Sequence, residues 1–147
     1  MHLPAELSVG FEELDRQHGV VLEALEAACR SSLERNLPAL RAAAAALGDA
    51  LVAHFAAEEA FMEESLYPDR ARHKAAHDLF MQDFAQLGRE LQGAVLTDHA
   101  ARWVNTRVPE WVKFHIRVND EPLGRFLAAR RFRPRAPAAA APKSQAS

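Results

Sequence analysis

The sequence has little cysteine, no long apolar run and no surplus of positive charge. Its single cysteine, Cys29, has no internal partner for a disulfide, so nothing indicates an oxidising compartment. A net charge of -2 argues against a dedicated nucleic-acid binder. The chain does not begin with a basic segment and an apolar run, and no stretch approaches the roughly 20 apolar residues of a membrane span. We therefore expect a cytoplasmic protein without a membrane span.

Apolar side chains recur at helical spacing over most of the chain. They follow three- and four-residue steps in four stretches: from about residue 11, over 36–65, over 69–92, and after Thr97. Short turns between such stretches predict an all-α, up-and-down antiparallel four-helix bundle over residues 11–127. The chain is long enough to bury this core without disulfides.

The two ends of the chain differ in character from the bundle. Residues 1–10 are expected to form an N-terminal arm, because Pro4 and Gly10 oppose an early helix. Residues 128–147 are rich in arginine, proline and alanine, which predicts a disordered tail. Its clustered arginines make it a candidate contact for an acidic protein partner or a membrane surface.

Several residues predict where helices begin. Asn36 and Thr97 are candidate N-caps for the second and fourth helices, and Asp69 is one for the third, after a break at Tyr67-Pro68. Pro109 is expected either to kink the fourth helix or to mark its true start.

Two pairs of metal-ligand residues sit on either side of the second turn. His54 and Glu58 are four residues apart, as are His73 and His77, so each pair projects from one face of its helix. All four residues fall in inward apolar stripes. A buried carboxylate such as Glu58 needs a partner or a metal, because a lone buried anion is costly. The neighbouring acids on the same helix are expected to be solvated: Glu59, Glu63 and Glu64.

Three further candidate ligands come from the other two helices. His18 falls in the first inward stripe and His115 in the fourth. Asp120 follows His115 by five residues, a spacing that an ideal α-helix would place on rather different faces. Five imidazoles and two carboxylates suit a dinuclear metal site in the core, with the carboxylates as bridges. Iron, zinc, copper and nickel all fit these ligands.

These residues closely resemble the hemerythrin family, and within it the single-domain bacteriohemerythrins. The resemblance runs from about Leu7 to Asp120, most of the chain. The matching segments are Leu7-Ser8-Val9-Gly10 with Leu14 to His18, His54 to Glu59 with Met62, Tyr67-Pro68 with His73 and His77, and Trp111 with His115-Ile116 and Asp120.

The resemblance implies a non-haem diiron centre that binds O2 reversibly, for oxygen carriage, storage or delivery. By similarity, His73, His77 and His115 would complete one iron. His18 and His54 would hold the other and leave one position open for O2, while Glu58, Asp120 and a solvent-derived oxygen would bridge the two irons. The pocket at the open position would be apolar and lined by Val21, Phe55, Phe80, Trp111, Val112 and Ile116.

The residues leave two other functions open. One is a diiron enzyme that reduces peroxide or nitric oxide, and the other is an O2 or redox sensor module, which normally needs an output domain. A site with only two acids favours binding over oxygenation, because neutral histidines stabilise ferrous iron better than carboxylates do. Val21 and Val112 stand where the family commonly has leucine. We therefore expect a roomier pocket with faster ligand exchange and faster autoxidation.

Overall fold

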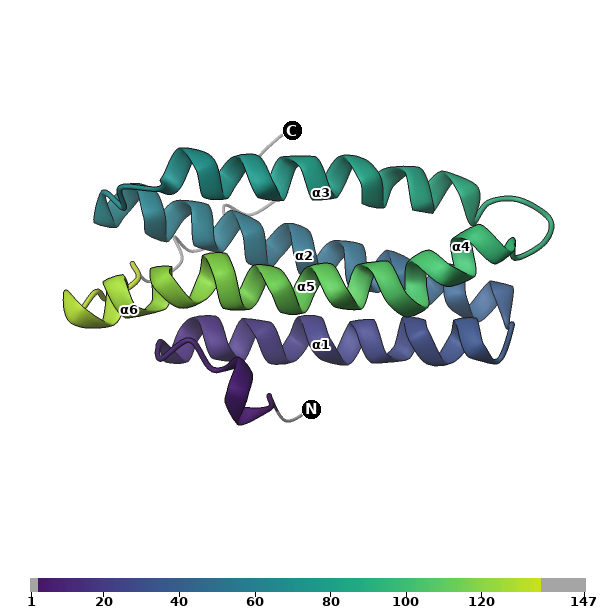
Figure 1. Ribbon diagram of the computed structural model, residues 1–147, viewed down its shortest axis with the longest axis horizontal. Helices are drawn as coiled ribbons and strands as arrows, with labels where there is room; N and C mark the ends of the chain where they lie inside the picture. The colour runs from purple at the N-terminus through teal and green to yellow at the C-terminus, as the bar shows by residue number, and fades with distance from the viewer. Residues whose placement is uncertain (1–2, 136–147) are drawn as a thin grey trace, which may run out of the picture.

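Three short turns divide the chain into four long helical stretches, as the apolar periodicity predicts (Figure 1). The structure is a computed structural model and describes residues 3–135. A short 3-10 helix, η1 (Ala5–Leu7), precedes α1 (Glu12–Leu33), α2 (Leu37–Ser65) and α3 (Arg70–Glu90). The fourth stretch, residues 98–129, is built from α4 (Asp98–Arg102), η2 (Trp103–Arg107), α5 (Val108–His115), η3 (Ile116–Asp120) and α6 (Glu121–Ala129). Successive stretches run antiparallel, which confirms the up-and-down four-helix bundle.

The core lies along the apolar stripes that the sequence predicts. Every member of the α2 stripe is buried: Leu40, Ala44, Leu47, Leu51, His54, Phe55, Glu58, Phe61 and Met62. Every member of the third stripe is buried as well: His73, His77, Phe80, Phe84, Leu87 and Leu91. The polar members of the two stripes keep the same helical spacing as the apolar ones. They therefore lie on the side of each helix that packs against the other helices. Packing therefore forces these polar side chains into the core.

Caps fix where the helices begin and end. Asn36 accepts a hydrogen bond from the Ala39 N–H, and Thr97 accepts one from the Ala100 N–H, as expected of N-caps. Asp69 occupies the expected N-cap position of α3, but its side chain makes no capping hydrogen bond. α2 ends where Leu66 takes a left-handed conformation with φ of 55°.

The fourth helical stretch contains two π-helical segments, η2 and η3, in which hydrogen bonds span five residues. The Val108 N–H bonds the Trp103 carbonyl, and the Glu121 N–H bonds the Ile116 carbonyl. A proline follows each segment, Pro109 in α5 and Pro122 in α6. Proline has no N–H to donate and crowds the carbonyl four residues back, so a widened turn relieves both problems. Pro109 thus lies inside the helical stretch and does not mark its start.

The N-terminal arm packs onto the end of the bundle. Leu7 and Val9 are buried. Gly124 in α6 permits this contact, because a Cβ atom at that position would lie only 2.2 Å from the Val9 carbonyl oxygen. The Val9 N–H also donates to the Asp15 carboxylate over 2.8 Å. The arm is therefore part of the packed structure.

The sequence places the predicted start of the disordered tail at residue 128, which is too early in the chain. α6 continues to Ala129, and the Phe132 ring then packs near Phe11 and Phe61, with centroid separations of 6.2 and 5.7 Å. Burying this aromatic ring on the bundle holds the segment in place. Residues 136–147 lie outside the described part of the chain, so disorder there and a partner for the tail stay predictions.

α2 is long and apolar enough to cross a membrane, contrary to the expectation that no stretch would be. Within residues 3–135 it is the one helix of sufficient length and hydropathy, with a mean hydropathy of 1.3 over 18 residues. The core helix of a bundle can have the same length and hydropathy, and α2 carries His54 and Glu58 on its inward face. This apolar helix is therefore weak evidence for a membrane span, and the cytoplasmic location stays a prediction.

Candidate metal centre

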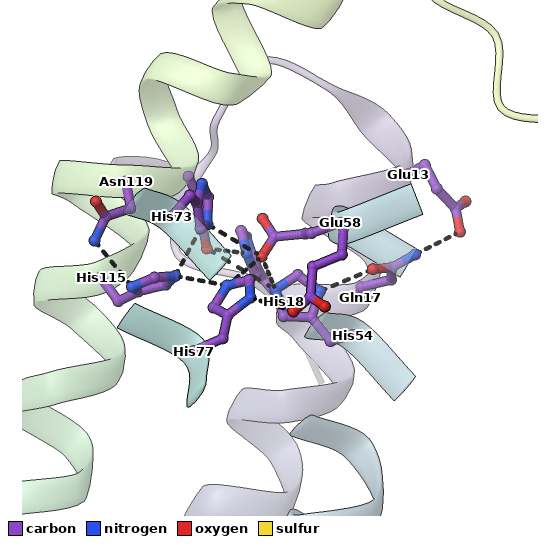
Figure 2. A network of polar contacts seen from close by, with 11 residues as sticks. Glu13, Gln17, His18, His54, Glu58, His73, His77, His115 and Asn119 are labelled. Carbon is purple, nitrogen blue, oxygen red and sulfur yellow. Dashed lines mark hydrogen bonds and ion pairs between the residues drawn. The ribbon is translucent and has the colours of Figure 1, made fainter. Parts of the chain in front are cut away.

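Seven polar side chains from all four helical stretches meet in one buried region of the core (Figure 2). The two carboxylates, Glu58 and Asp120, are fully buried. α1 supplies His18, α2 supplies His54 and Glu58, α3 supplies His73 and His77, and the fourth stretch supplies His115 and Asp120. The structure thus brings together every residue that the sequence analysis names as a candidate ligand.

The seven residues form two overlapping groups. One holds Glu58, His73, His77, His115 and Asp120, and the other holds His18, His54, Glu58 and Asp120. Within each group, one ligand atom from every residue lies within 4.8 Å of the others. Glu58 and Asp120 belong to both groups. Since a carboxylate has two oxygens, each acid is placed to bridge two neighbouring cations.

The five imidazoles present the same nitrogen to the centre. Nε2 of His73 lies 3.0 Å from Asp120 Oδ1, and Nε2 of His77 lies 3.1 Å from Glu58 Oε1. Nε2 of His18 lies 2.8 Å from Asp120 Oδ2. The remaining two Nε2 atoms also face a carboxylate, at 3.4 Å for His54 and 3.2 Å for His115. Five ring nitrogens of one kind therefore converge on two acids.

Several of these inward atoms lack a hydrogen bond of good geometry within residues 3–135. They are His54 Nε2, His73 Nε2, both Glu58 oxygens and Asp120 Oδ1. Buried polar atoms without partners cost about 1–3 kcal/mol each, more when charged. Bound cations would satisfy all of them, because each is a metal-ligand atom. The donor set therefore fits metal ions better than it fits a network of hydrogen bonds.

The pKa values of the two carboxylates are shifted in opposite directions. Burial raises the pKa of Glu58 well above its usual value, and the charge of Asp120 raises it further. Burial also tends to raise the pKa of Asp120, but its close contacts with the imidazoles of His115, His18 and His54 outweigh burial and hold the pKa well below its usual value. Two acids this close do not both ionise easily without a counter-charge. Cations between them would supply that charge.

The imidazoles also differ among themselves. Burial and the nearby His115 and His73 lower the pKa of His77 to about 2. Burial opposes the charged form of His73 too, but its contacts with Asp120 and Glu58 raise its pKa to about 9. A metal requires neutral imidazoles, so binding would displace the proton held by His73.

The π-helical segment η3 explains how Asp120 reaches the centre. Its hydrogen bonds span five residues, which brings positions five apart onto the same side of the helix. His115 directly precedes this segment and Asp120 ends it. The awkward spacing in the sequence is therefore accommodated by one widened turn.

Three residues behind the imidazoles were not assigned to the site from the sequence. Gln17 Oε1 lies 2.8 Å from His54 Nδ1, Glu59 Oε2 lies 2.9 Å from His77 Nδ1, and Asn119 Nδ2 lies 2.9 Å from His115 Nδ1. The expectation that Glu59 is solvated is wrong, because its carboxylate contacts a candidate ligand. The one available signal was that a metal-bound histidine needs a partner for its other nitrogen.

Two residues of the expected apolar pocket, Phe55 and Trp111, stack on candidate ligands. Val21, Phe55, Phe80, Val112 and Ile116 are buried, and Trp111 is half-buried. The Phe55 ring stacks on His77 with centroids 3.9 Å apart. Such contacts exclude water and hold the imidazole planes in place.

Comparisons with known proteins agree with this geometry. Residues 9–127 match the family described as the hemerythrin HHE cation binding domain. A bacteriohemerythrin of Stenotrophomonas maltophilia is 29% identical over 117 residues, which cover 79% of this chain and 74% of the relative. A bacteriohemerythrin of Pseudomonas paraeruginosa is 25% identical over 115 residues, or 78% of this chain and 73% of the relative.

Solved structures show the same fold. The crystal structure of a wild-type hemerythrin superposes with a TM-score of 0.72 at 26% identity, over 82% of this chain and 91% of that one. A hemerythrin point mutant gives a TM-score of 0.74 at 27% identity, over 87% and 99% of the two chains. The matched family spans all four helical stretches and every candidate ligand, and this chain therefore belongs to the hemerythrin family.

Proposed function

We propose that this chain holds two iron ions at the candidate metal centre and binds O2 reversibly. The observation that carries the proposal is the unequal sharing of five histidines between two groups that have Glu58 and Asp120 in common. With both acids bridging, three histidines would serve one ion and two the other. The second ion would then have one ligand fewer from the protein, which would leave room for O2. The named relatives are bacteriohemerythrins, which supports the same assignment.

Each ligand has a defined part in this proposal. His73, His77 and His115 would hold one ion, His18 and His54 the other, and the two carboxylates both. When bound, a pair of ferrous ions would supply the two electrons that reversible O2 binding requires. The few acids in the set favour this chemistry over oxygenation, because neutral imidazoles stabilise the ferrous state.

The apolar residues near the centre would keep water away from a bound gas. Phe55 and Val112 are 5% and 3% exposed, and Val21 and Ile116 are buried to a similar degree. An apolar, water-excluding wall keeps solvent protons away from a polar ligand on the metal. This arrangement would favour release of intact O2 over autoxidation of the site.

Metal analysis together with optical spectra tests the proposal. The anaerobically reduced protein is measured before O2 is admitted, after it is admitted, and after purging. We expect about two irons per chain and a charge-transfer band that appears with O2 and disappears on purging. Glu64→Gln, an exposed substitution on the same helix, serves as the control and should behave as the wild type.

Other outcomes would contradict the proposal in different ways. Two irons with immediate irreversible oxidation would favour the redox-sensor function, and steady turnover of peroxide or nitric oxide with a reductant would favour the enzyme. Zinc, or an absence of iron after loading with ferrous salt, would show that the family's iron chemistry does not apply here.

A further inference from the structure

A chain of hydrogen bonds connects the surface of α1 to the metal centre through Gln17 (Figure 2). Gln17 Nε2 donates to Glu13 Oε1 over 3.0 Å, and Gln17 Oε1 lies 2.8 Å from His54 Nδ1. Glu13 and Gln17 are four residues apart on α1, so they stack along one face. The route is therefore short and uses both ends of one amide.

Glu13, at the outer end, decides which atoms donate and which accept along this series of hydrogen bonds. An ionised carboxylate only accepts hydrogen bonds, so Glu13 must receive one from the Gln17 amide nitrogen. The amide oxygen of Gln17 then faces His54 and can only accept, which requires a proton on His54 Nδ1. The lone pair of His54 Nε2 is left directed at Glu58, 3.4 Å away.

We propose that Glu13 and Gln17 are positioning residues that hold His54 in the Nδ1–H tautomer, with Nε2 ready to bind metal. This inference rests on the metal-binding part of the proposed function but not on O2 binding. It concerns the two-histidine half of the centre, where His18 Nδ1 has no hydrogen-bond partner among the described residues. His54 is thus the histidine of that half whose Nδ1 has a protein partner.

Glu13 is itself held in place. Arg16 donates to both of its oxygens, at 2.6 and 3.2 Å, and the hydrogen bond from Arg16 lowers the pKa of Glu13. Glu13 therefore stays ionised and remains an acceptor at neutral pH. Glu13, Arg16 and Gln17 line a surface groove of about 890 Å³ between α1, α2 and the segment that contains Phe132. Residues at the edge of this groove thus set the tautomer of the buried His54.

Removing the outer anchor should have a defined consequence. Without a carboxylate at position 13, the Gln17 amide can turn and present its nitrogen to His54. An amide nitrogen donates, so it stabilises the opposite tautomer, in which Nε2 carries the proton and cannot bind metal. Metal binding to this half would then require the proton to move first.

Cobalt(II) titration of the full chain tests the inference, with Gln17→Leu, Gln17→Glu and Glu13→Gln as variants. Glu12→Gln is the matched control, because Glu12 is an exposed neighbour on the same groove with no hydrogen bond to Gln17. We expect Gln17→Leu to weaken one of the two cobalt sites about 10–100-fold and leave the other unchanged. Glu13→Gln should show a smaller loss at the same site, whereas Gln17→Glu keeps an acceptor for His54 Nδ1 and should bind more tightly than Gln17→Leu.

The imidazole Nδ1–H proton gives a second readout, in NMR spectra of the cobalt-loaded protein. It should be visible and exchange slowly for His54 in the wild type, Gln17→Glu and Glu12→Gln, and it should disappear by fast exchange in Gln17→Leu. Two intact cobalt sites and a slow proton in Gln17→Leu would overturn the inference, as would equal weakening of both sites. A wild-type chain that binds no cobalt at all would instead count against the proposed metal centre.

Discussion

The indole ring of Trp111 lies flat on the imidazole of His115, with ring centroids 4.5 Å apart and planes inclined by 11°. The Phe80 ring stacks on the same indole at 3.9 Å. Trp111 is half-buried, so it connects a candidate metal ligand to the surface of the bundle. The stack restrains the rotation of His115 and places a fluorescent side chain beside the metal centre.

Metal loading should therefore quench Trp111. The chain has two tryptophans, so Trp103→Phe leaves Trp111 as the sole tryptophan. We expect loading with cobalt(II) to reduce its emission strongly, because quenching by a metal ion falls steeply with distance. The reciprocal variant, Trp111→Phe, leaves Trp103 and should show a weaker effect. Equal quenching in both variants would contradict the contact.

Glu58→Gln should have opposite effects on metal content and on the stability of the metal-free chain. The variant loses a bridging oxygen and should retain fewer than two metal ions. Burial and Asp120 both oppose the ionised form of Glu58, so a neutral amide should stabilise the metal-free chain. Metal analysis and thermal unfolding with a chelator measure the two effects. Exposed Glu64→Gln is the control, and a less stable metal-free Glu58→Gln chain would refute the electrostatic argument.

The metal-free chain should be most stable near pH 6.5. The pKa of His77 is about 2 when folded and that of His54 is also lowered, against an ordinary value of 6.5. Below 6.5 the unfolded chain binds more protons, so stability is lost as the pH falls. The pKa of His73 is about 9 when folded, so the folded chain binds the extra proton between 6.5 and 9, and stability is lost as the pH rises through 9.

Denaturant unfolding from about pH 5 to about pH 9 measures this profile, with and without metal. Metal should remove the alkaline loss, because a metal-bound His73 carries no proton in the folded state. It should steepen the acid loss, because protons compete with metal for the imidazoles. A metal-free profile that rises steadily to pH 9 would show that His73 is not protonated in the folded chain.

Val21→Leu and Val112→Leu should slow autoxidation and ligand exchange. Both valines are buried within one turn of a candidate ligand, His18 and His115 respectively. An added methylene narrows the pocket and excludes water better, although overpacking is expected to cost about 1–3 kcal/mol of stability. Decay of the oxygenated spectrum measures autoxidation. An unchanged rate in the double variant would show that these positions do not set the size of the pocket.

Gly124→Ala should displace the N-terminal arm. The new Cβ would lie 2.2 Å from the Val9 carbonyl oxygen, and backbone cannot move aside as a flexible side chain would. We expect a loss of about 1–3 kcal/mol in the free energy of unfolding. Gly88→Ala in α3 is the control, because nothing lies within 4 Å of its Cβ and alanine favours helix there. Equal stability of the two variants would contradict the close approach of the arm.

Local spacing determined much of this protein. The helical periodicity of apolar residues predicts the four helical stretches, and the same periodicity places His54, Glu58, His73 and His77 on inward faces. These features depend on residues a few positions apart, so the sequence alone specifies them. The family resemblance then added the expectation of two irons and of O2 binding, which no spacing could supply.

Contacts between distant segments decided the rest. Asp120 reaches the centre through a widened turn, which an ideal helix does not anticipate. Glu59 contacts His77 on another helix, and Gln17 contacts His54 in the same way, so neither role follows from its neighbours in the sequence. Phe132 belongs to the packed structure and not to the predicted tail, because its ring packs against Phe11 and Phe61. Each of these depends on which faces meet when the helices pack, and only the tertiary structure settles that.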